Sequence, residues 1–373
     1  MVTAKNMTIA CINDTNIFMR DNSVTYAKGV AIMLVVLGHA CFETPVEWWV
    51  NFIHVPLFFF MSGYCFKEEY LDAPITFIGK RIRGLYLPFV MWGLFFLMMH
   101  NVFYSLGVYN SVFGYNGIST MLYSVPDTIN RAFRILLFQY SERLLGGYWF
   151  LPSLFTGSVV FYITLKILRN QTSHGMTIII GGGLFTISIL LQQFNISVYL
   201  LNSRNILAAI FIFLGYAYRK NNCQIHQQTW FICFSLIGVS LGVAFWRSSM
   251  VSFTTCTIIP YILTATCGLL AIFGICTRLS KMENKYLDNA LLFIGNNTLS
   301  TLTWHMTAFV LVNLLIIKVY NINPKRLAEF PVIKEFADTY WGLVYFTVAM
   351  LACCIIAYIG RRITISLRSK WHH

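Results

Sequence analysis

The sequence between Tyr26 and Tyr70 reads YAKGVAIMLVVLGHACFETPVEWWVNFIHVPLFFFMSGYCFKEEY. It contains two apolar runs joined by a short acidic turn, with His39 in or beside the first run and His54 in or beside the second. A titratable side chain inside a membrane-spanning segment is costly, so such residues usually have a function. His39 and His54 are therefore the first candidates for a functional site.

The composition is that of an integral membrane protein. Hydrophobic residues make up 57% of the chain and charged residues 11%, whereas a soluble domain has roughly 45–50% apolar and about 25% charged residues. Mean hydropathy is +0.65. The net charge of +13 then indicates basic residues that flank spans and contact membrane lipid, and we expect no nucleic-acid binding. The ten cysteines lack metal-ligand spacing, so we expect no metal.

The fold predicted is an all-α, polytopic membrane helix bundle. Apolar runs long enough to cross about 30 Å of hydrocarbon occur about ten times. The ninth is long enough to break near Gly295-Asn296-Asn297. The predicted spans are 26–42, 48–66, 84–106, 148–168, 176–194, 204–218, 228–246, 253–276, 290–319 and 340–360.

The distribution of basic residues predicts the orientation. With the N-terminus in the cytoplasm, the inner side carries about twice as many lysines and arginines as the outer side, as the positive-inside rule requires. Ten spans then place both termini in the cytoplasm. The chain thus divides into a cytoplasmic N-terminal segment, 1–25, a membrane domain, 26–360, and a cytoplasmic C-terminal tail, 361–373.

Two outer segments differ in character. Residues 107–147 form a long, aromatic segment that is too hydrophobic for disorder, so we expect it to re-enter the membrane or to cover an outer cavity. Residues 321–339 carry charges of both signs, and we expect them to form a solvated connector.

Lys28 and His39 are eleven residues apart in the first span. On a helix they differ by about 20° in direction, so they share a face, and they stand roughly 16 Å apart along the axis. A cation at the cytoplasmic mouth and a base deeper along the same face suit delivery of a phosphate-bearing donor. The alternative is a snorkelling lysine and a histidine bonded to a neighbouring helix.

Other candidates flank the next spans. His54 could face the same cavity as His39, or it could be an interfacial histidine. Lys80, Arg81 and Arg83 lie at the cytoplasmic entrance to the third span. Such a cluster binds phosphate oxygens or only sets the topology.

Polar and aromatic residues mark two later spans. Tyr148 and Trp149 lie at the outer start of the fourth span, where aromatic residues also serve as membrane anchors. Asn297, Thr301 and His305 recur at intervals of four in the ninth span, which places a polar stripe on one helix face. The stripe is predicted to face the bundle interior, as part of a catalytic site or as interhelical hydrogen-bonding groups.

Taken together, these segments resemble the acyltransferase-3 family of integral membrane acyltransferases, and in particular its sugar O-acetyltransferases. The most specific match is the first, a basic residue followed by ten others and a histidine. The matching blocks are YxKGxAIxLVVLGH (Tyr26 to His39), HVPLFFFMSGY (His54 to Tyr64), KRIRxLxxPF (Lys80 to Phe89), YWFL (Tyr148 to Leu151) and IGNNTLSTLTWH (Ile294 to His305).

The resemblance implies an acyl-CoA donor on the cytoplasmic side and a carbohydrate hydroxyl as acceptor. It also implies that His39 is the essential histidine and that Lys28 is its basic partner, where the family more often has arginine. The family's Arg-x-x-Arg pair has no direct equivalent here. Arg81 is followed at that distance by Gly84, whereas Lys80 and Arg83 keep the spacing.

We therefore expect an O-acyltransferase of a bacterial inner membrane, with acetyl-CoA as co-substrate and no permanently bound cofactor. The acceptor would be a cell-surface glycan or its lipid-linked precursor. The expected catalytic residues are His39, as base or acetylated intermediate, and His54 or Glu43, which would orient it. The residues expected to hold acyl-CoA are Lys28, Lys80, Arg81 and Arg83, and those expected to bind the acceptor are Tyr148, Trp149 and His305.

Two other functions fit parts of the sequence. A transporter or flippase could use buried histidines for protons or substrate, but it would carry broken helices in paired positions of two repeats, and none are visible in the sequence. A non-enzymatic scaffold for polysaccharide assembly would tolerate replacement of Lys28 and His39. Small-residue faces such as 181–183 would serve internal packing or a homo-oligomer equally well.

Overall fold

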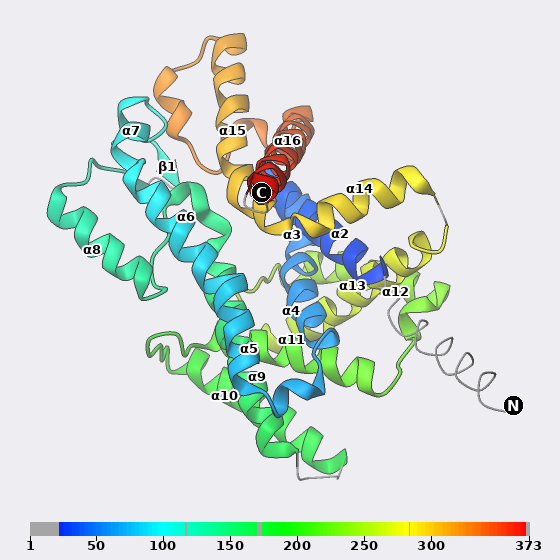
Figure 1. Cartoon of the computed structure of the whole chain (residues 1–373). Helices are drawn as coiled ribbons and strands as arrows, with labels where there is room; N and C mark the ends of the chain where they lie inside the picture. Colours follow the sequence, from blue (N-terminus) through cyan, green and yellow to red (C-terminus); the bar gives the residue numbers. More distant parts are fainter. Residues whose placement is uncertain (1–21, 116–117, 170–173, 283, 371–373) are drawn as a thin grey trace, which may run out of the picture.

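The computed structural model describes residues 22–115, 118–169, 174–282 and 284–370. They form a bundle of helices, accompanied in the described ranges by one hairpin of two-residue strands, β1 (Gly114–Tyr115) and β2 (Ile118–Ser119) (Figure 1). The predicted all-α class is confirmed. The α-helices are α2 (Asn22–Ala40), α3 (Pro45–Asn51), α4 (His54–Tyr64), α5 (Pro74–Arg81), α6 (Leu87–Met98), α7 (His100–Ser105), α8 (Val125–Leu136), α9 (Phe150–Leu168), α10 (His174–Gln193), α11 (Ser203–Lys220), α12 (Thr229–Phe245), α13 (Ile258–Leu279), α14 (Lys285–Asn296), α15 (Thr298–Tyr320) and α16 (Tyr340–Lys370).

Short helices of other types connect them. A π-helix, η2 (Ile82–Tyr86), joins α5 to α6. The 3-10 helices are η1 (Glu68–Leu71), η3 (Arg143–Trp149), η4 (Ile225–Gln227), η5 (Pro324–Ala328) and η6 (Lys334–Phe336).

Within the described ranges, 6 helical segments are long and apolar enough to cross a membrane by length and composition. Helices of this length and composition are those of an integral membrane protein, while the number of ten spans and the location of the termini stay predictions. The 6 segments are Asn22–Ala40, Pro74–Ser105, Arg143–Leu168, Ile258–Leu279, Thr298–Tyr320 and Tyr340–Ile363.

Two of the predicted spans are interrupted. The ninth breaks where the sequence indicates, because α14 ends at Asn296 and α15 begins at Thr298. The second is also in two pieces, and its break at Phe52 and Ile53 precedes Pro56. His54 is consequently the first residue of α4, at a helix terminus rather than inside a continuous span.

Helix α2 lies at the centre of the bundle. It contacts α3, α4, α13, α14, α15 and α16. A Cβ atom on Gly29 of α2 would lie 3.0 Å from the Leu291 carbonyl oxygen, and one on Gly295 of α14 would lie 2.1 Å from the Thr25 oxygen. Helices in lipid associate through such close contacts of small residues, which bring backbones together.

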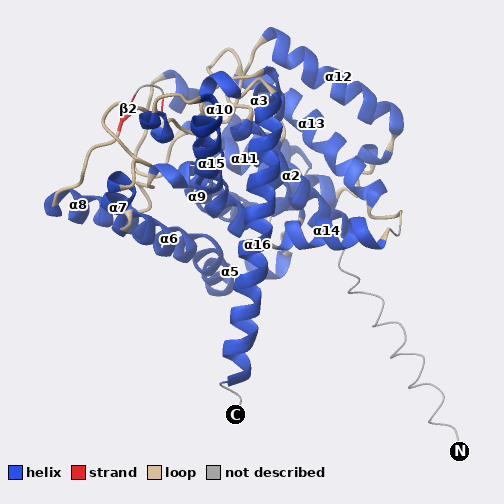
Figure 2. Ribbon diagram, turned by 90° about the horizontal axis from the view of Figure 1, so that it is seen from above, coloured by secondary structure: helices blue, strands red, loops and turns tan. Residues whose placement is uncertain are grey.

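Helices α5, η2, α6 and α7 form one long rod from Pro74 to Ser105. The helix that contains the third predicted span, 84–106, therefore already begins at Pro74, and Lys80 and Arg81 lie within the helical rod. Helix α8 packs on α6. Figures 1 and 2 both show α7 and α8 at the end of the rod remote from α5.

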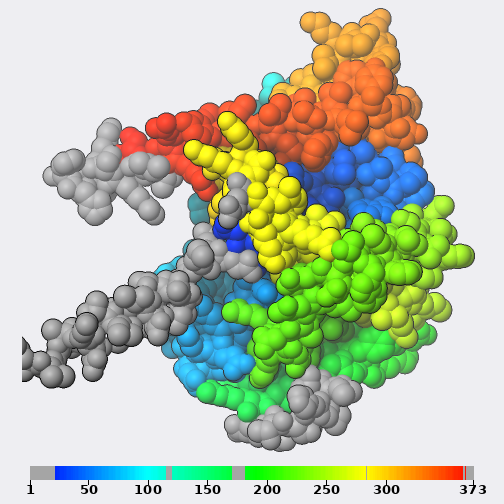
Figure 3. All heavy atoms as spheres, turned by 90° about the vertical axis from the view of Figure 1, so that its right-hand side faces the viewer, coloured from blue at the N-terminus to red at the C-terminus, as the bar shows by residue number. Residues whose placement is uncertain are grey.

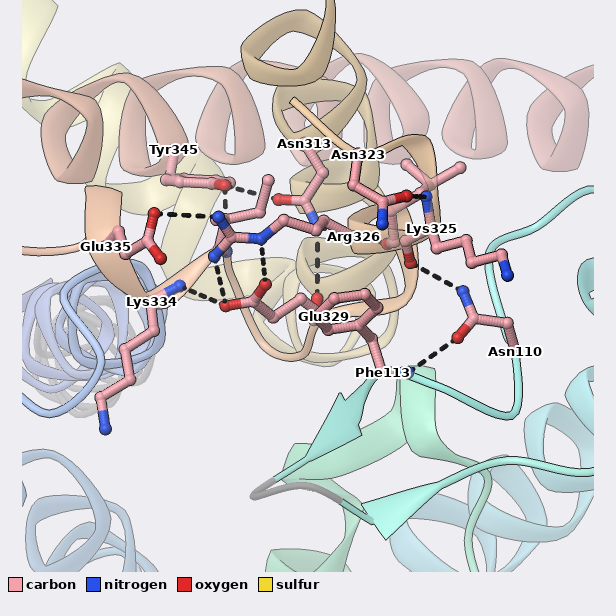
Figure 4. Close-up of polar contacts among 12 residues, drawn as sticks. Asn110, Phe113, Asn313, Asn323, Lys325, Arg326, Glu329, Lys334, Glu335 and Tyr345 are labelled. Atoms are coloured by element: carbon pink, nitrogen blue, oxygen red, sulfur yellow. Dashed lines mark hydrogen bonds and ion pairs between the residues drawn. The ribbon is translucent and has the colours of Figure 1, made fainter. Parts of the chain in front are cut away.

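Segment 321–339 is more than the solvated connector that its charges indicate. Leu327, Val332 and Ile333 are buried, so the segment packs on the bundle. Three of its charged residues pair with one another: Arg326 Nε donates to Glu329 at 2.9 Å and Arg326 Nη1 to Glu335 at 2.9 Å (Figure 4). Arg326 holds the pKa of the Glu335 carboxyl below its usual range. The apolar residues between the charges decide the packing.

Helix α16 continues beyond the predicted last span, which ends at residue 360, as far as Lys370. Its C-terminal part extends away from the bundle (Figures 2 and 3). Most of the predicted N-terminal segment, 1–25, lies outside the described residues, because the first described helix begins at Asn22.

Candidate active site

A cavity of about 1450 Å³ extends through the bundle. Pockets for one small ligand commonly hold about 300–1,000 Å³. The wall is built by α2, α3, α4, α5, segment 120–154, residues 247–252 and the first turns of α15. The volume exceeds that of an ordinary pocket for one small ligand.

His39 lines this cavity from the last turn of α2. Lys28, from the same unbroken helix, also lines it, roughly 16 Å away along the helix axis. The half-buried His39 ring stacks on His305 of α15, with ring centroids 5.4 Å apart and planes at 29°. The structure thus places a cation and an imidazole on one wall, and a second imidazole against the first.

His305 lies behind His39. It is 0% exposed and is absent from the cavity lining of the described residues. Its Nδ1 lies 3.0 Å from the Thr301 carbonyl oxygen, which can only accept a hydrogen bond, so in the neutral ring Nδ1 carries the proton. The Nε2 atom is buried and has no hydrogen-bond partner among the described residues. His305 is thus placed to support His39.

His54 and Glu43 also line the cavity. His54 Nδ1 donates to the Val50 carbonyl oxygen at 2.6 Å, which leaves the Nε2 lone pair of the neutral ring available. The Glu43 carboxylate instead forms an ion pair with Lys334 of segment 321–339. Of the two residues expected to orient His39, Glu43 is therefore engaged by another partner.

The predicted phosphate-binding residues separate into two groups. Lys80 and Arg81 line the cavity, whereas Arg83 is exposed and lies outside the lining. Lys80 Nζ donates to the Tyr70 hydroxyl at 2.8 Å, and Arg81 Nη2 donates to Ser62 Oγ at 3.0 Å. The structure therefore brings together Lys28, Lys80 and Arg81, but not Arg83.

Of the two aromatic residues at the start of the fourth predicted span, Tyr148 and Trp149, one lines the cavity and the other does not. Trp149 lines the cavity, with the Arg204 guanidinium 5.0 Å from its ring centroid. Tyr148 is fully buried, and its hydroxyl hydrogen-bonds to Thr303 Oγ1 at 2.7 Å. Trp149 can contact a substrate, whereas Tyr148 joins η3 to α15.

A second polar cluster is absent from the sequence predictions. His100 Nδ1 lies 2.9 Å from Glu142 Oε2, and its ring stacks on Tyr123 at 3.3 Å between centroids. The Tyr140 hydroxyl donates to Glu142 Oε1 at 3.0 Å and shares a hydrogen bond of 2.9 Å with the Tyr123 hydroxyl. Arg131 of α8 lies over both tyrosine rings, and it lines the cavity with Tyr123, Tyr140 and Glu142.

This cluster lies in the long aromatic segment and at the end of the third span. Burial and the neighbouring Glu142 carboxylate raise the pKa of Tyr123, so its phenol stays protonated near neutral pH. One signal was present in the sequence, because His100 is a titratable residue in an apolar run, like His39. Its partners could not be found from spacing, since Glu142 is 42 residues away.

The comparison with known families is decisive. The family model described as an acyltransferase domain, of the acyltransferase-3 type, matches residues 21–359. The chain belongs to the acyltransferase-3 family. The resemblance seen in the sequence is thereby confirmed, and the protein is a membrane acyltransferase.

A curated relative adds a weaker similarity. Over 164 residues the chain is 25% identical to nodulation protein NolL of Mesorhizobium japonicum. The match covers 40% of this chain and 36% of the relative, so the chain spans about a third of that protein's length. No solved structure matches the chain.

Proposed function

We propose that this acyltransferase transfers an acetyl group from acetyl-CoA to a sugar hydroxyl of a cell-surface glycan or its lipid-linked precursor. The observation that carries the proposal is the position of His39, which lines one cavity together with the cations Lys28, Lys80 and Arg81. Lysine and arginine side chains on the wall of the same cavity suit the phosphates of CoA. The remaining volume leaves room for an acceptor.

The reaction needs a base because a hydroxyl is a poor nucleophile near neutral pH. The acceptor oxygen attacks the thioester carbonyl carbon while His39 takes the hydroxyl proton. The carbon–sulfur bond then breaks, and the CoA thiolate leaves with the proton that His39 returns. In a variant of this mechanism, His39 first attacks the thioester and is acetylated while CoA leaves. The sugar hydroxyl then attacks the acetyl group, and the bond to His39 breaks.

The neighbours of His39 have distinct proposed roles. His305 positions the His39 ring by stacking from behind, since its own ring is fully buried. His54, with its Nε2 lone pair available, is the second imidazole among the residues that line the cavity. Trp149 offers an aromatic face to the apolar surface of a sugar ring.

The membrane arrangement is part of the same proposal. Ten spans with both termini in the cytoplasm would present Lys28, Lys80 and Arg81 to cytoplasmic acetyl-CoA, in a bacterial inner membrane. The region lined by Trp149 and by segment 120–143 would then receive the acceptor from the outer side.

The first experiment measures CoA released from acetyl-CoA by the purified protein in nanodiscs, with His39→Ala beside the wild type. Loss of general-base catalysis should lower the rate by about 10²- to 10⁴-fold. Equal thermal unfolding midpoints would show that the variant is folded. Normal turnover by a folded His39→Ala protein would contradict the assignment, and absence of turnover and acetyl-CoA binding in the wild type would contradict the proposed donor.

A further inference from the structure

We propose that Arg131 forms a binding site for an oxyanion, a carboxylate or a phosphate, carried by the acceptor substrate. The inference rests on the proposed function, because it names the chemical class of the substrate that receives the acyl group. Its basis is the polar cluster around His100, which the donor-binding and catalytic assignments leave unused.

The Arg131 side chain is held by aromatic rings. Its guanidinium carbon lies 3.9 Å from the Tyr123 ring centroid and 4.9 Å from that of Tyr140. Guanidinium groups stack on aromatic faces and keep their N–H donors in the plane for a ligand. The Nε atom is buried without a hydrogen-bond partner among the described residues. Since Arg131 also lines the cavity, it offers a charged donor to a bound molecule.

The acids near Arg131 are engaged by other groups. Asp127 accepts a hydrogen bond of 2.6 Å from the Ser124 hydroxyl in the cap of α8. Glu142 is bound by His100 and Tyr140. Arg131 takes part in none of the ion pairs recorded for the described residues. The Asp127 carboxylate, one turn earlier on α8, attracts Arg131 electrostatically but forms no ion pair with it among the described residues, so the guanidinium N–H groups can donate to an external anion.

This position is remote from the proposed donor site. His100, which anchors the cluster, lies 19 residues after Arg81 in the rod from Pro74 to Ser105. At about 1.5 Å per residue the two positions are roughly 28 Å apart. The phosphates of CoA bound at Lys80 and Arg81 would not reach Arg131, so the anion proposed for Arg131 is a different one.

Helix α8 has two faces with different surroundings. Asp127 and Arg131 line the cavity, and Ile135, one turn further, is fully buried. On the opposite side, Ile129 and Phe133 are 64% and 63% exposed. In a membrane protein an exposed apolar face of this kind contacts lipid. The oxyanion could accordingly belong to an acidic sugar or to the phosphate of a lipid carrier.

The test measures binding to the full-length protein in nanodiscs of zwitterionic lipid, by thermophoresis. The soluble probes are glucuronate and, as the neutral match, glucose; the lipid probes are farnesyl phosphate and farnesol. We expect at least one anionic probe to bind the wild type about tenfold more tightly than its neutral match, as one charged hydrogen bond allows. If glucuronate binds more tightly than glucose, the anion belongs to a sugar; if farnesyl phosphate binds more tightly than farnesol, it belongs to a lipid phosphate.

The variants assign this preference to one side chain. Arg131→Gln should abolish it and Arg131→Lys should retain part of it, whereas Arg83→Gln, a matched control at an exposed position outside the cavity lining, should leave it intact. If Arg131→Gln does not fold, Tyr123→Leu is used in its place, because it removes a ring that supports Arg131. Tyr123→Leu should weaken the preference for the anionic probe, whereas Tyr123→Phe, which keeps the ring, should retain it. Equal binding of charged and neutral probes, or equal effects of Arg131→Gln and Arg83→Gln, would overturn the inference. Because the readout is binding, this inference and the proposed function can fail separately. A protein that prefers the anionic probes but shows no acetyl-CoA turnover would contradict the proposed function and leave the anion site intact.

Discussion

The side chains around His39 show how individual residues build the site. His39 comes from α2 and His305 from α15, and their rings stack at 5.4 Å between centroids. The polar stripe in the ninth span indicates that His305 faces inward, but only the packing of α15 against α2 brings the two rings together. A buried imidazole against the proposed base fixes the orientation of that base, which lowers the reorganisation needed during proton transfer.

At the same scale, the structure separates two arginines that the sequence does not. Arg81→Gln should raise the KM for acetyl-CoA by roughly tenfold to a hundredfold, because a charge-assisted hydrogen bond contributes about 1.5–3 kcal/mol. Arg83→Gln removes the same charge from an exposed position outside the cavity lining, so its effect should be much smaller. Steady-state CoA release at varied acetyl-CoA provides the measurement. Equal changes in KM would show that the cavity does not bind the donor phosphates through Arg81.

Pairs of helices depend on a few glycines. Helices α4 and α11 cross so closely that a Cβ on Gly63 would lie 1.7 Å from the Ile212 carbonyl oxygen, and one on Gly215 would lie 2.0 Å from the Phe60 oxygen. Each glycine thus contacts the backbone of the other helix. Because α4 carries His54 and Ser62, this crossing positions part of the cavity wall.

Gly63→Ala should therefore destabilise the protein strongly. The obstructing atom belongs to the backbone, so the helices would have to separate. We therefore expect the free energy of unfolding to fall by at least the upper end of the about 1–3 kcal/mol that is typical of overpacking. The thermal unfolding midpoint in detergent gives the measurement. Gly182→Ala is the matched control, since nothing lies within 4 Å of its Cβ position. Similar midpoints for both variants would contradict the close crossing.

Segment 321–339 contacts both the turn between α2 and α3 and helix η3 at the cavity. Its Lys334 pairs with Glu43, which has a left-handed backbone at φ 60° between α2 and α3. Phe330 and Pro331 line the cavity, and the Phe330 ring lies 2.9 Å from the position of a Cβ on Gly146. Glycine at position 146 leaves space for that ring, so this segment forms part of the cavity wall next to η3.

For the whole molecule, the ten-span arrangement predicts that Cys223 and residue 325 lie on opposite sides of the membrane. Both positions are exposed in the structure. In a protein whose other exposed cysteines are replaced by serine, a membrane-impermeant maleimide added to intact cells should label Lys325→Cys and leave Cys223 unlabelled. Permeabilised cells should show labelling at both positions. Labelling of both in intact cells would mean an even number of crossings between them and would exclude the predicted ten-span arrangement.

Much of the architecture could be predicted from the sequence. Apolar runs have to be helical in lipid because their backbone groups have no other partners there, so periodicity and length identify most helices. The same energetic cost singles out titratable residues in these runs, which is how His39, His54 and the stripe ending at His305 are found. The spacing of Lys28 and His39 predicts a shared face, since both belong to one unbroken helix.

The tertiary structure alone decided which of these residues meet. The contact of His39 with His305 and that of His100 with Glu142 join segments far apart in the chain, and the exposure of Arg83 likewise follows from the packing around it. The packing of segment 321–339 likewise depends on the apolar residues between its charges. Local pattern determines what a segment becomes, whereas close packing between backbones, set here by glycines such as Gly63 and Gly295, determines its neighbours.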